Sequence, residues 1–263
     1  MIVNEDFSDS SYRLKENCDA DKASKYKNFE TAAGLQAVDG LKPSKLFYRL
    51  ADEVVEGKKT YKQMELELDF GHEEKEADLV ATRIAELLEI EYFDVLDPSV
   101  LTDIHAHLFP GVLDEKIVGK YRNKDIVKDE PILNGASVDY GLWDNIEKTL
   151  EISFRQQARK DLAVFGEKEK AYELFKFINH IWRIHPFFEG NTRTIAVFAI
   201  KYLNEVGFEI DNEPFKEHSY YFRNALVRAN SGVGGRTFEF LNKFVDNLLF
   251  GADNELDVQE EYM

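Results

Sequence analysis

The residues best suited to chemistry lie together in segment 185–194, which reads His-Pro-Phe-Phe-Glu-Gly-Asn-Thr-Arg-Thr. His185 titrates near neutral pH and can take a proton from an attacking hydroxyl. A helix that begins near Asn191 presents unpaired N–H groups, which bind anions such as phosphate. Glu189 lies beside this anion site, where its negative charge would repel phosphate. A cation such as Mg²⁺ that bridges the carboxylate to the phosphate would explain this position. The segment therefore predicts phosphate chemistry.

Two further residues of this segment support the same interpretation. Gly190 allows the backbone to approach a ligand closely, and Arg193 adds a cation that can bind phosphate oxygens as a fork. Each of these residue types alone is more often a helix cap or a surface ion pair. Here a base, an acid and an anion-binding helix start occur together within nine residues. This combination favours a functional site over ordinary caps and surface ion pairs.

The segment resembles the signature of the Fic family, which reads His-x-Phe-x-(Asp/Glu)-Gly-Asn-Gly-Arg-x-x-Arg. The matching positions are His185, Phe187, Glu189, Gly190, Asn191 and Arg193, and Pro186 is also frequent in the family. Two positions depart from the signature, with Thr192 in place of Gly and Ala196 in place of the second Arg. The resemblance extends over roughly residues 70–250.

The resemblance implies an all-α fold, a helical bundle with one small β-hairpin called the flap. It implies transfer of AMP from ATP, with Mg²⁺, to a Ser, Thr or Tyr hydroxyl of a target protein, including self-modification. The implied roles are His185 as general base, Glu189 as the Mg²⁺ ligand, Gly190, Asn191 and Thr192 as the anion hole, and Arg193 as the grip on the leaving phosphates. Asn191 would also contact phosphate through its side chain.

The flap is expected near residues 124–137, where Asn134-Gly135 is a hairpin-turn signal. By resemblance, the flap would dock the target segment by strand addition, and Lys128 lies in it. Asn230 falls where Fic enzymes often contact the adenine of the nucleotide.

The two departures leave alternatives open. A side chain at Thr192 could narrow the phosphate site, and Ala196 removes a cation expected near the γ-phosphate. The same fold could therefore transfer phosphate or another nucleotide. A third alternative is a non-catalytic module that binds a nucleotide or a protein partner.

A second resemblance covers residues 34–44, which are similar to the inhibitory helix of Fic antitoxins. Leu35 stands in place of Ser/Thr and Asp39 in place of Glu. In the family, that Glu pairs with the second Arg, and Asp39 facing Ala196 is expected not to make this pair. A fused lobe with a lost or altered brake and an ordinary loop are equally supported. An antitoxin partner and a homo-oligomer both stay open.

Apolar residues at helical spacing predict α-helices over most of the remaining chain. Helices are expected over 72–92, 98–109, 142–157, 167–184, from 191 onward, 213–230 and 236–250, with 167–184 at the centre of the bundle. The expected organisation is a polar arm over 1–28, a small helical and antitoxin-like lobe over 29–70, a catalytic domain over 71–250, and a frayed acidic tail over 251–263.

Composition limits the partners. A hydrophobic fraction of 44% predicts a packed core. A formal charge of −17 argues against nucleic acid and against anionic membranes. The single cysteine and the lack of an apolar stretch of signal or membrane-spanning length favour the cytoplasm. The spacing of His105, His107 and His180 does not suit a metal site.

Overall fold

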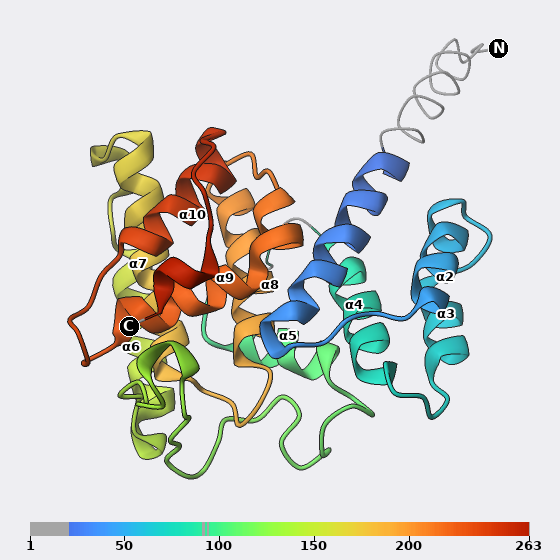
Figure 1. Cartoon of the computed structure of the whole chain (residues 1–263), viewed down its shortest axis with the longest axis horizontal. Helices are drawn as coiled ribbons and strands as arrows, with labels where there is room; N and C mark the ends of the chain where they lie inside the picture. Colours follow the sequence, from blue (N-terminus) through green and yellow to red (C-terminus); the bar gives the residue numbers. More distant parts are fainter. Residues whose placement is uncertain (1–20, 91–92, 94, 263) are drawn as a thin grey trace, which may run out of the picture.

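A computed structural model describes residues 21–90, 93 and 95–262, and in these residues the fold is helical without any strand (Figure 1). The α-helices are α2 (Lys45–Val55), α3 (Tyr61–Leu68), α4 (Lys75–Leu88), α5 (Ser99–Leu108), α6 (Ile146–Ala158), α7 (Glu167–Ile184), α8 (Asn191–Glu205), α9 (Glu213–Asn230) and α10 (Glu239–Phe250). Residues 21–34 are also helical. Short 3₁₀ helices are η1 (Leu35–Asp39), η2 (Pro131–Leu133), η3 (Trp143–Asn145), η4 (Leu162–Val164) and η5 (Val258–Glu261).

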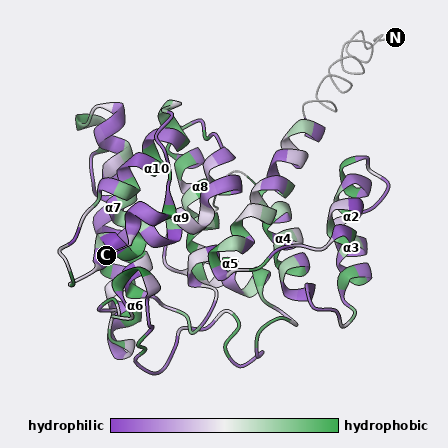
Figure 2. Ribbon diagram, in the orientation of Figure 1, coloured by the Kyte–Doolittle hydropathy of each residue, from purple (hydrophilic) through white to green (hydrophobic). Residues whose placement is uncertain are grey.

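Helix α8 forms the centre of the molecule. It packs against α4, α5 and α7, and every residue from 191 to 203 is buried. The sequence pattern placed 167–184 at the centre, but α7 keeps an exposed polar face and covers α8 from one side. Most other helices alternate between hydrophilic and hydrophobic residues along their length (Figure 2), as amphipathic helices around one core should.

Two helices of the N-terminal region begin at capping residues. Ser44 caps α2 by accepting a hydrogen bond from the N–H of Phe47 at 3.2 Å. Thr60 and Gln63 form a reciprocal capping box at the start of α3. Each of these caps joins residues that are only three positions apart in the chain.

The polar arm predicted over 1–28 is helical from residue 21, where a helix begins that continues to residue 34. Residues 1–20, including Cys18, lie outside the described residues.

The N-terminal helix ends at Gly34, where a Cβ would stand only 2.2 Å from the carbonyl oxygen of Lys216. Gly34 therefore permits close contact with α9, and Ser219 Oγ donates to its carbonyl at 2.5 Å. This contact brings η1, and with it Asp39, over the start of α8.

The predicted β-hairpin is absent from the described residues. The turn itself exists, because Asn134 and Gly135 both have positive φ, 53° and 86°. The ladder does not form, since η2 occupies residues 131–133 and the N–H of Lys128 donates to Ser137 Oγ at 3.2 Å instead of to a backbone carbonyl. The segment 123–140 is an irregular loop that lies over His185, and we call it the flap loop.

The acidic tail is not frayed where the structure describes it. Residues 251–262 return along α9, with Leu256 buried and Glu261 fully buried in η5. Burial raises the pKa of Glu261 to about 9. Leu256 and Glu261 therefore anchor the tail against the folded domain, while most of its other residues are exposed.

Candidate active site

His185 stands at the junction between α7 and the loop that leads to α8. Its backbone adopts the left-handed conformation, φ 52° and ψ 64°, and its N–H donates to the carbonyl of Trp182 at 3.0 Å. Pro186 then prevents the helix from continuing. A left-handed residue with a side chain costs roughly 1–2 kcal/mol, so other contacts must hold His185 there.

Arg122 supplies these contacts. Its side chain is fully buried, and Nε donates to the carbonyl of His185 at 2.8 Å. The remaining guanidinium nitrogens donate to the carbonyls of Lys124, Gly141 and Ile184. The N–H of Arg122 also donates to Pro186 at 2.8 Å. One buried cation thus binds the residues on both sides of His185 to the flap loop, a role that the sequence analysis missed.

The ring of His185 is buried and has one nitrogen available. Nδ1 faces the carbonyl of Trp182 at 3.3 Å, so it carries the hydrogen. Nε2 has no hydrogen-bond partner among the described residues. Burial, and next the charge of Lys128, lower the pKa of His185 well below its usual value. At neutral pH the ring is therefore neutral, with a free lone pair on Nε2, which is the state that a general base requires.

The loop between His185 and α8 is closed by the side chain of Asn191. Its Oδ1 accepts from the N–H of Phe187 at 2.9 Å, and its Nδ2 donates to the carbonyl of Phe187 at 2.8 Å. Both ends of the amide are therefore engaged within the loop, and the phosphate contact predicted for this side chain is not prepared in this structure. Thr192 turns its hydroxyl toward Trp182 Nε1, at 3.1 Å. The backbone N–H groups at the start of α8 remain as the anion-binding feature.

Gly190 has a left-handed backbone, φ 72°, and a Cβ there would lie 2.4 Å from the ring of Phe109. We expect Gly190→Ala to lower the free energy of unfolding by about 3 kcal/mol, since backbone strain and overpacking add. Gly207 is the matched control at the end of the same helix, because its φ is 90° but its Cβ would meet no described atom within 4 Å. Gly207→Ala should cost only about 1 kcal/mol. Urea unfolding measures the free energy of unfolding of both variants. Equal decreases would show that the ring of Phe109 moves aside without loss of stability.

Glu189 is held through its backbone by His105. The N–H of Gly119 donates to His105 Nδ1 at 3.0 Å, so Nε2 carries the hydrogen and donates to the carbonyl of Glu189 at 3.2 Å. Burial lowers the pKa of His105 to about 4, and its ring stacks on Phe187 at 4.1 Å. The spacing of His105 argued against a metal ligand, and nothing in the sequence connects this residue with the loop.

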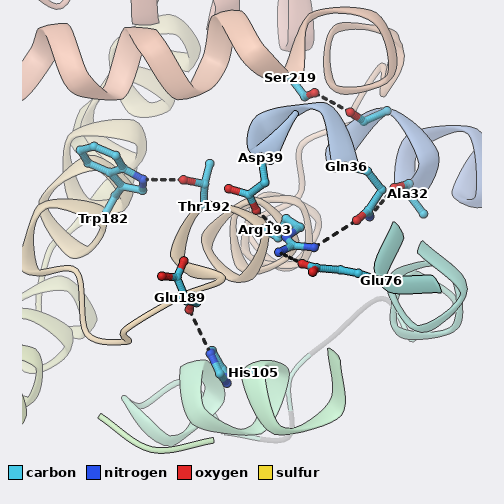
Figure 3. Close-up of polar contacts among 11 residues, drawn as sticks. Ala32, Gln36, Asp39, Glu76, His105, Trp182, Glu189, Thr192, Arg193 and Ser219 are labelled. Atoms are coloured by element: carbon cyan, nitrogen blue, oxygen red, sulfur yellow. Dashed lines mark hydrogen bonds and ion pairs between the residues drawn. The ribbon is translucent and has the colours of Figure 1, made fainter. Parts of the chain in front are cut away.

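The carboxylate of Glu189 points away from His105 (Figure 3) and lines a small cavity with the start of α8. No group of three potential metal-ligating side chains occurs within the described ranges. A single carboxylate still fits Mg²⁺, because this ion keeps several waters and takes further ligands from substrate phosphates. Glu189 is therefore suited to a metal that arrives with a nucleotide.

Arg193 is 3% exposed and lies among three acceptors (Figure 3). Its Nε is 2.7 Å from Asp39 Oδ2, its Nη2 is 2.7 Å from Glu76 Oε1, and its Nη1 donates to Gln36 Oε1 at 3.2 Å. Asp39 meets no arginine at position 196, which is Ala, but it pairs with the first arginine of the motif, a contact that the sequence did not indicate. Two carboxylates neutralise Arg193, and it does not line the cavity that contains His185.

That cavity brings together most of the residues predicted for the site. Its lining is Asp39, Lys128, Glu130, Trp182, His185, Glu189, Gly190, Asn191, Thr192 and Arg223. The space has room for about 30 Å³, roughly one water molecule. A nucleotide needs several hundred Å³, so η1 or the flap loop must move before a nucleotide can enter.

Asn230 does not belong to this cavity. It is buried and paired with the amide of Asn179, donating at 2.6 Å and accepting at 3.3 Å, while Nδ2 also donates to the carbonyl of Leu226. A nucleotide contact by Asn230 therefore stays a prediction that would need this pair to open. His180 bonds Ser153 Oγ at 3.0 Å, as expected for a structural histidine.

Comparison with known proteins finds one family model that matches part of the chain. Residues 95–203 match the Fic/DOC family. This part of the chain is similar to Fic/DOC domains. The matched residues include the whole loop from His185 to Arg193 and both positioning residues, Arg122 and His105. Asp39, Glu76 and Arg223 lie outside the matched residues of the Fic/DOC domain.

Solved structures share the Fic/DOC fold. The N-terminal FIC domain of Bep8, a VirB-translocated effector of Bartonella sp. 1-1C, has 18% identity and a TM-score of 0.53, over 69% of this chain and 88% of that chain. A Fic domain from Bartonella quintana has 19% identity and a TM-score of 0.53, over 69% and 86%. BepC from Bartonella tribocorum, solved with bound AMPPNP, has 16% identity and a TM-score of 0.51, over 66% and 84%.

No curated protein matches the sequence. Within the described residues, none of the helices combines the length and the hydropathy that crossing a bilayer requires.

Proposed function

We propose that this protein transfers AMP from ATP to a hydroxyl side chain of a target protein, with His185 as general base. The observation that carries the proposal is the free, buried Nε2 of His185 in one cavity with Glu189 and the start of α8. A base, a metal-binding carboxylate and an anion-binding helix start are the groups that nucleotidyl transfer needs.

In the proposed reaction the hydroxyl oxygen of the target attacks the α-phosphorus of ATP. A new O–P bond forms, the bond from the α-phosphorus to the bridging oxygen breaks, and pyrophosphate leaves with that electron pair. The hydroxyl proton passes to His185 Nε2. Mg²⁺, when bound by Glu189 and the phosphates, would neutralise developing charge. The N–H groups at the start of α8 would bind the phosphoryl oxygens. The single cysteine agrees with a reaction in the cytoplasm, where ATP is available.

The direct test is intact-mass spectrometry of the full chain after incubation with ATP and Mg²⁺, alone and with candidate target proteins. A gain equal to one AMP moiety, on the chain or on a target, supports AMP transfer. A mass gain equal to one phosphate would instead show phosphate transfer, the alternative that Thr192 and Ala196 left open. Nucleotide binding without any gain would favour a non-catalytic binding module.

We further propose that Asp39 restrains the site. It places a carboxylate in the cavity beside Glu189 while it neutralises Arg193. We expect Asp39→Asn to tighten ATP binding roughly 5- to 10-fold, equivalent to about 1 kcal/mol, and to raise the transfer rate, because one repulsive charge leaves the phosphate site. Isothermal titration with ATP and Mg²⁺ measures the change.

Two controls separate the possible causes. Glu76→Gln also frees Arg193, but Glu76 does not line the cavity, so an equal gain would locate the effect in Arg193 rather than in the cavity. Asp69→Asn removes an exposed acid paired with Lys75 and should change nothing. An unchanged affinity in Asp39→Asn would contradict the restraint. Deleting residues 1–60 is a weaker test, because it also removes Phe29, Leu35 and other parts of the core.

A further inference from the structure

Two cations face the start of α8 inside the cavity, and neither is Arg193. They are Lys128 from the flap loop and Arg223 from α9. Their charges act directly on the site, since both help to lower the pKa of His185, whose own burial is the largest cause. The buried and unpartnered Nε2 of His185 lines the same space. A cavity with a helix N-terminus and two cations is built for a polyanion.

Arg193 cannot serve this polyanion as it stands. Its guanidinium is 3% exposed, and two carboxylates and one amide surround it. It also stacks against the ring of Phe109, with a distance of 5.0 Å from Cζ to the ring centroid. These contacts tie Arg193 to η1, α4 and α5, so its role in this structure is to hold elements together.

Arg223 is held differently, by a single carboxylate. Its Nη2 donates to Glu130 Oε2 at 2.7 Å, and Nη1 reaches only the neighbouring Asn224 Oδ1 at 3.3 Å. Glu130 is fully buried, and its other oxygen accepts from the hydroxyl of Tyr140 at 3.0 Å. The side chain of Arg223 keeps 19% exposure. A guanidinium has five N–H donors, so most of this fork remains available to a ligand.

We infer that Arg223, supported by Lys128, is the cation that binds the β- and γ-phosphates of the donor, an inference that rests on the proposed function. Glu130 holds the guanidinium at the cavity until a polyphosphate arrives. The phosphate oxygens then take over N–H donors as a charge-assisted fork. Lys128 adds a point charge from the flap loop on the same side.

The experiment compares Glu130→Gln with the double variant Glu130→Gln plus Arg223→Gln. Arg223→Gln alone would leave a buried carboxylate unpaired and could unfold the protein, whereas the double variant is neutral at both positions. Isothermal titration of the full chain uses inorganic pyrophosphate, ATP and AMP as probes. Glu130→Gln plus Arg155→Gln is the matched control, because Arg155 is an exposed arginine of α6 outside this cavity.

Glu130→Gln should bind pyrophosphate and ATP more tightly than the unaltered protein, because its arginine is released. Relative to Glu130→Gln alone, the double variant with Arg223→Gln should have a Kd for pyrophosphate and ATP that is about 10- to 100-fold higher. The Kd for AMP should be unchanged. Equal Kd values for pyrophosphate with and without Arg223 would overturn the inference and leave the proposed function standing. Arg223-dependent binding without any mass gain in the transfer assay would support the inference and overturn the proposed function. Absence of pyrophosphate and ATP binding in all variants would overturn both.

Discussion

Replacing His185 by alanine is expected to lower the rate of AMP transfer by about 10²- to 10⁴-fold, the usual contribution of a positioned general base. Nucleotide affinity should remain nearly unchanged, because the substitution leaves in place the groups proposed to bind phosphate, namely the backbone of α8, Glu189 with its proposed metal, Arg223 and Lys128. Transfer is measured as the rate of mass gain with ATP and Mg²⁺, and affinity by isothermal titration.

His180→Ala is the matched control for this substitution. His180 lies on the same helix, but its Nε2 is engaged with Ser153 Oγ and it does not line the cavity with His185. Its loss should leave the transfer rate within about twofold, as expected for a substitution outside the site. Equal rates in the unaltered protein and in His185→Ala would remove His185 from the mechanism.

The pH dependence carries a second signature of His185. A general base works only when it is deprotonated, and burial holds the pKa of His185 well below its ordinary value. The ring should therefore stay neutral when the pH falls from 8 to about 6, where an ordinary histidine, pKa about 6.5, is mostly protonated. We expect kcat/KM to be constant over this range and to fall only in more acidic buffer. A decline centred near pH 6.5 would show that the ring is solvated in the free enzyme.

Arg122→Met is expected to lower the free energy of unfolding by about 3–5 kcal/mol and to abolish transfer. The substitution removes the donors to four carbonyl groups, those of Lys124, Gly141, Ile184 and His185. Each buried acceptor without a partner costs about 1–3 kcal/mol, partly recovered by water. His185 also loses the contact that stabilises its left-handed backbone. Urea unfolding at pH 7.5 measures the stability.

Two variants bracket this result. Arg155→Met removes an exposed arginine of α6 and should change stability by less than about 0.5 kcal/mol. Arg122→Lys keeps the charge but cannot reproduce the planar fork, so its stability should fall between that of the unaltered protein and that of Arg122→Met. A loss below about 1 kcal/mol in Arg122→Met would mean that solvent replaces the guanidinium, and the positioning role would fail.

The sequence alone determined the local parts of this protein. The spacing from His185 to Arg193 predicted the loop and the helix that follows it, and the lobe over 29–70 is helical, as expected. These features depend on residues within one or two helical turns, where backbone geometry limits the outcome to few conformations. The turn at Asn134 was predicted for the same reason, but the hairpin around it was not formed.

Only the tertiary structure decided which cations face the site. The motif suggested that Arg193 binds phosphate, yet its partners Gln36 and Glu76 lie 157 and 117 positions away in the chain. Arg122 reaches His185 across 63 positions, and Arg223 reaches Glu130 across 93. The contacts of Arg193 depend on how η1 and α4 pack against α8, and those of Arg122 and Arg223 depend on where the loop segment 122–140 lies against the end of α7 and against α9. A long side chain at a helix terminus can turn to either side, and packing, rather than spacing, selects the side on which its charge is neutralised.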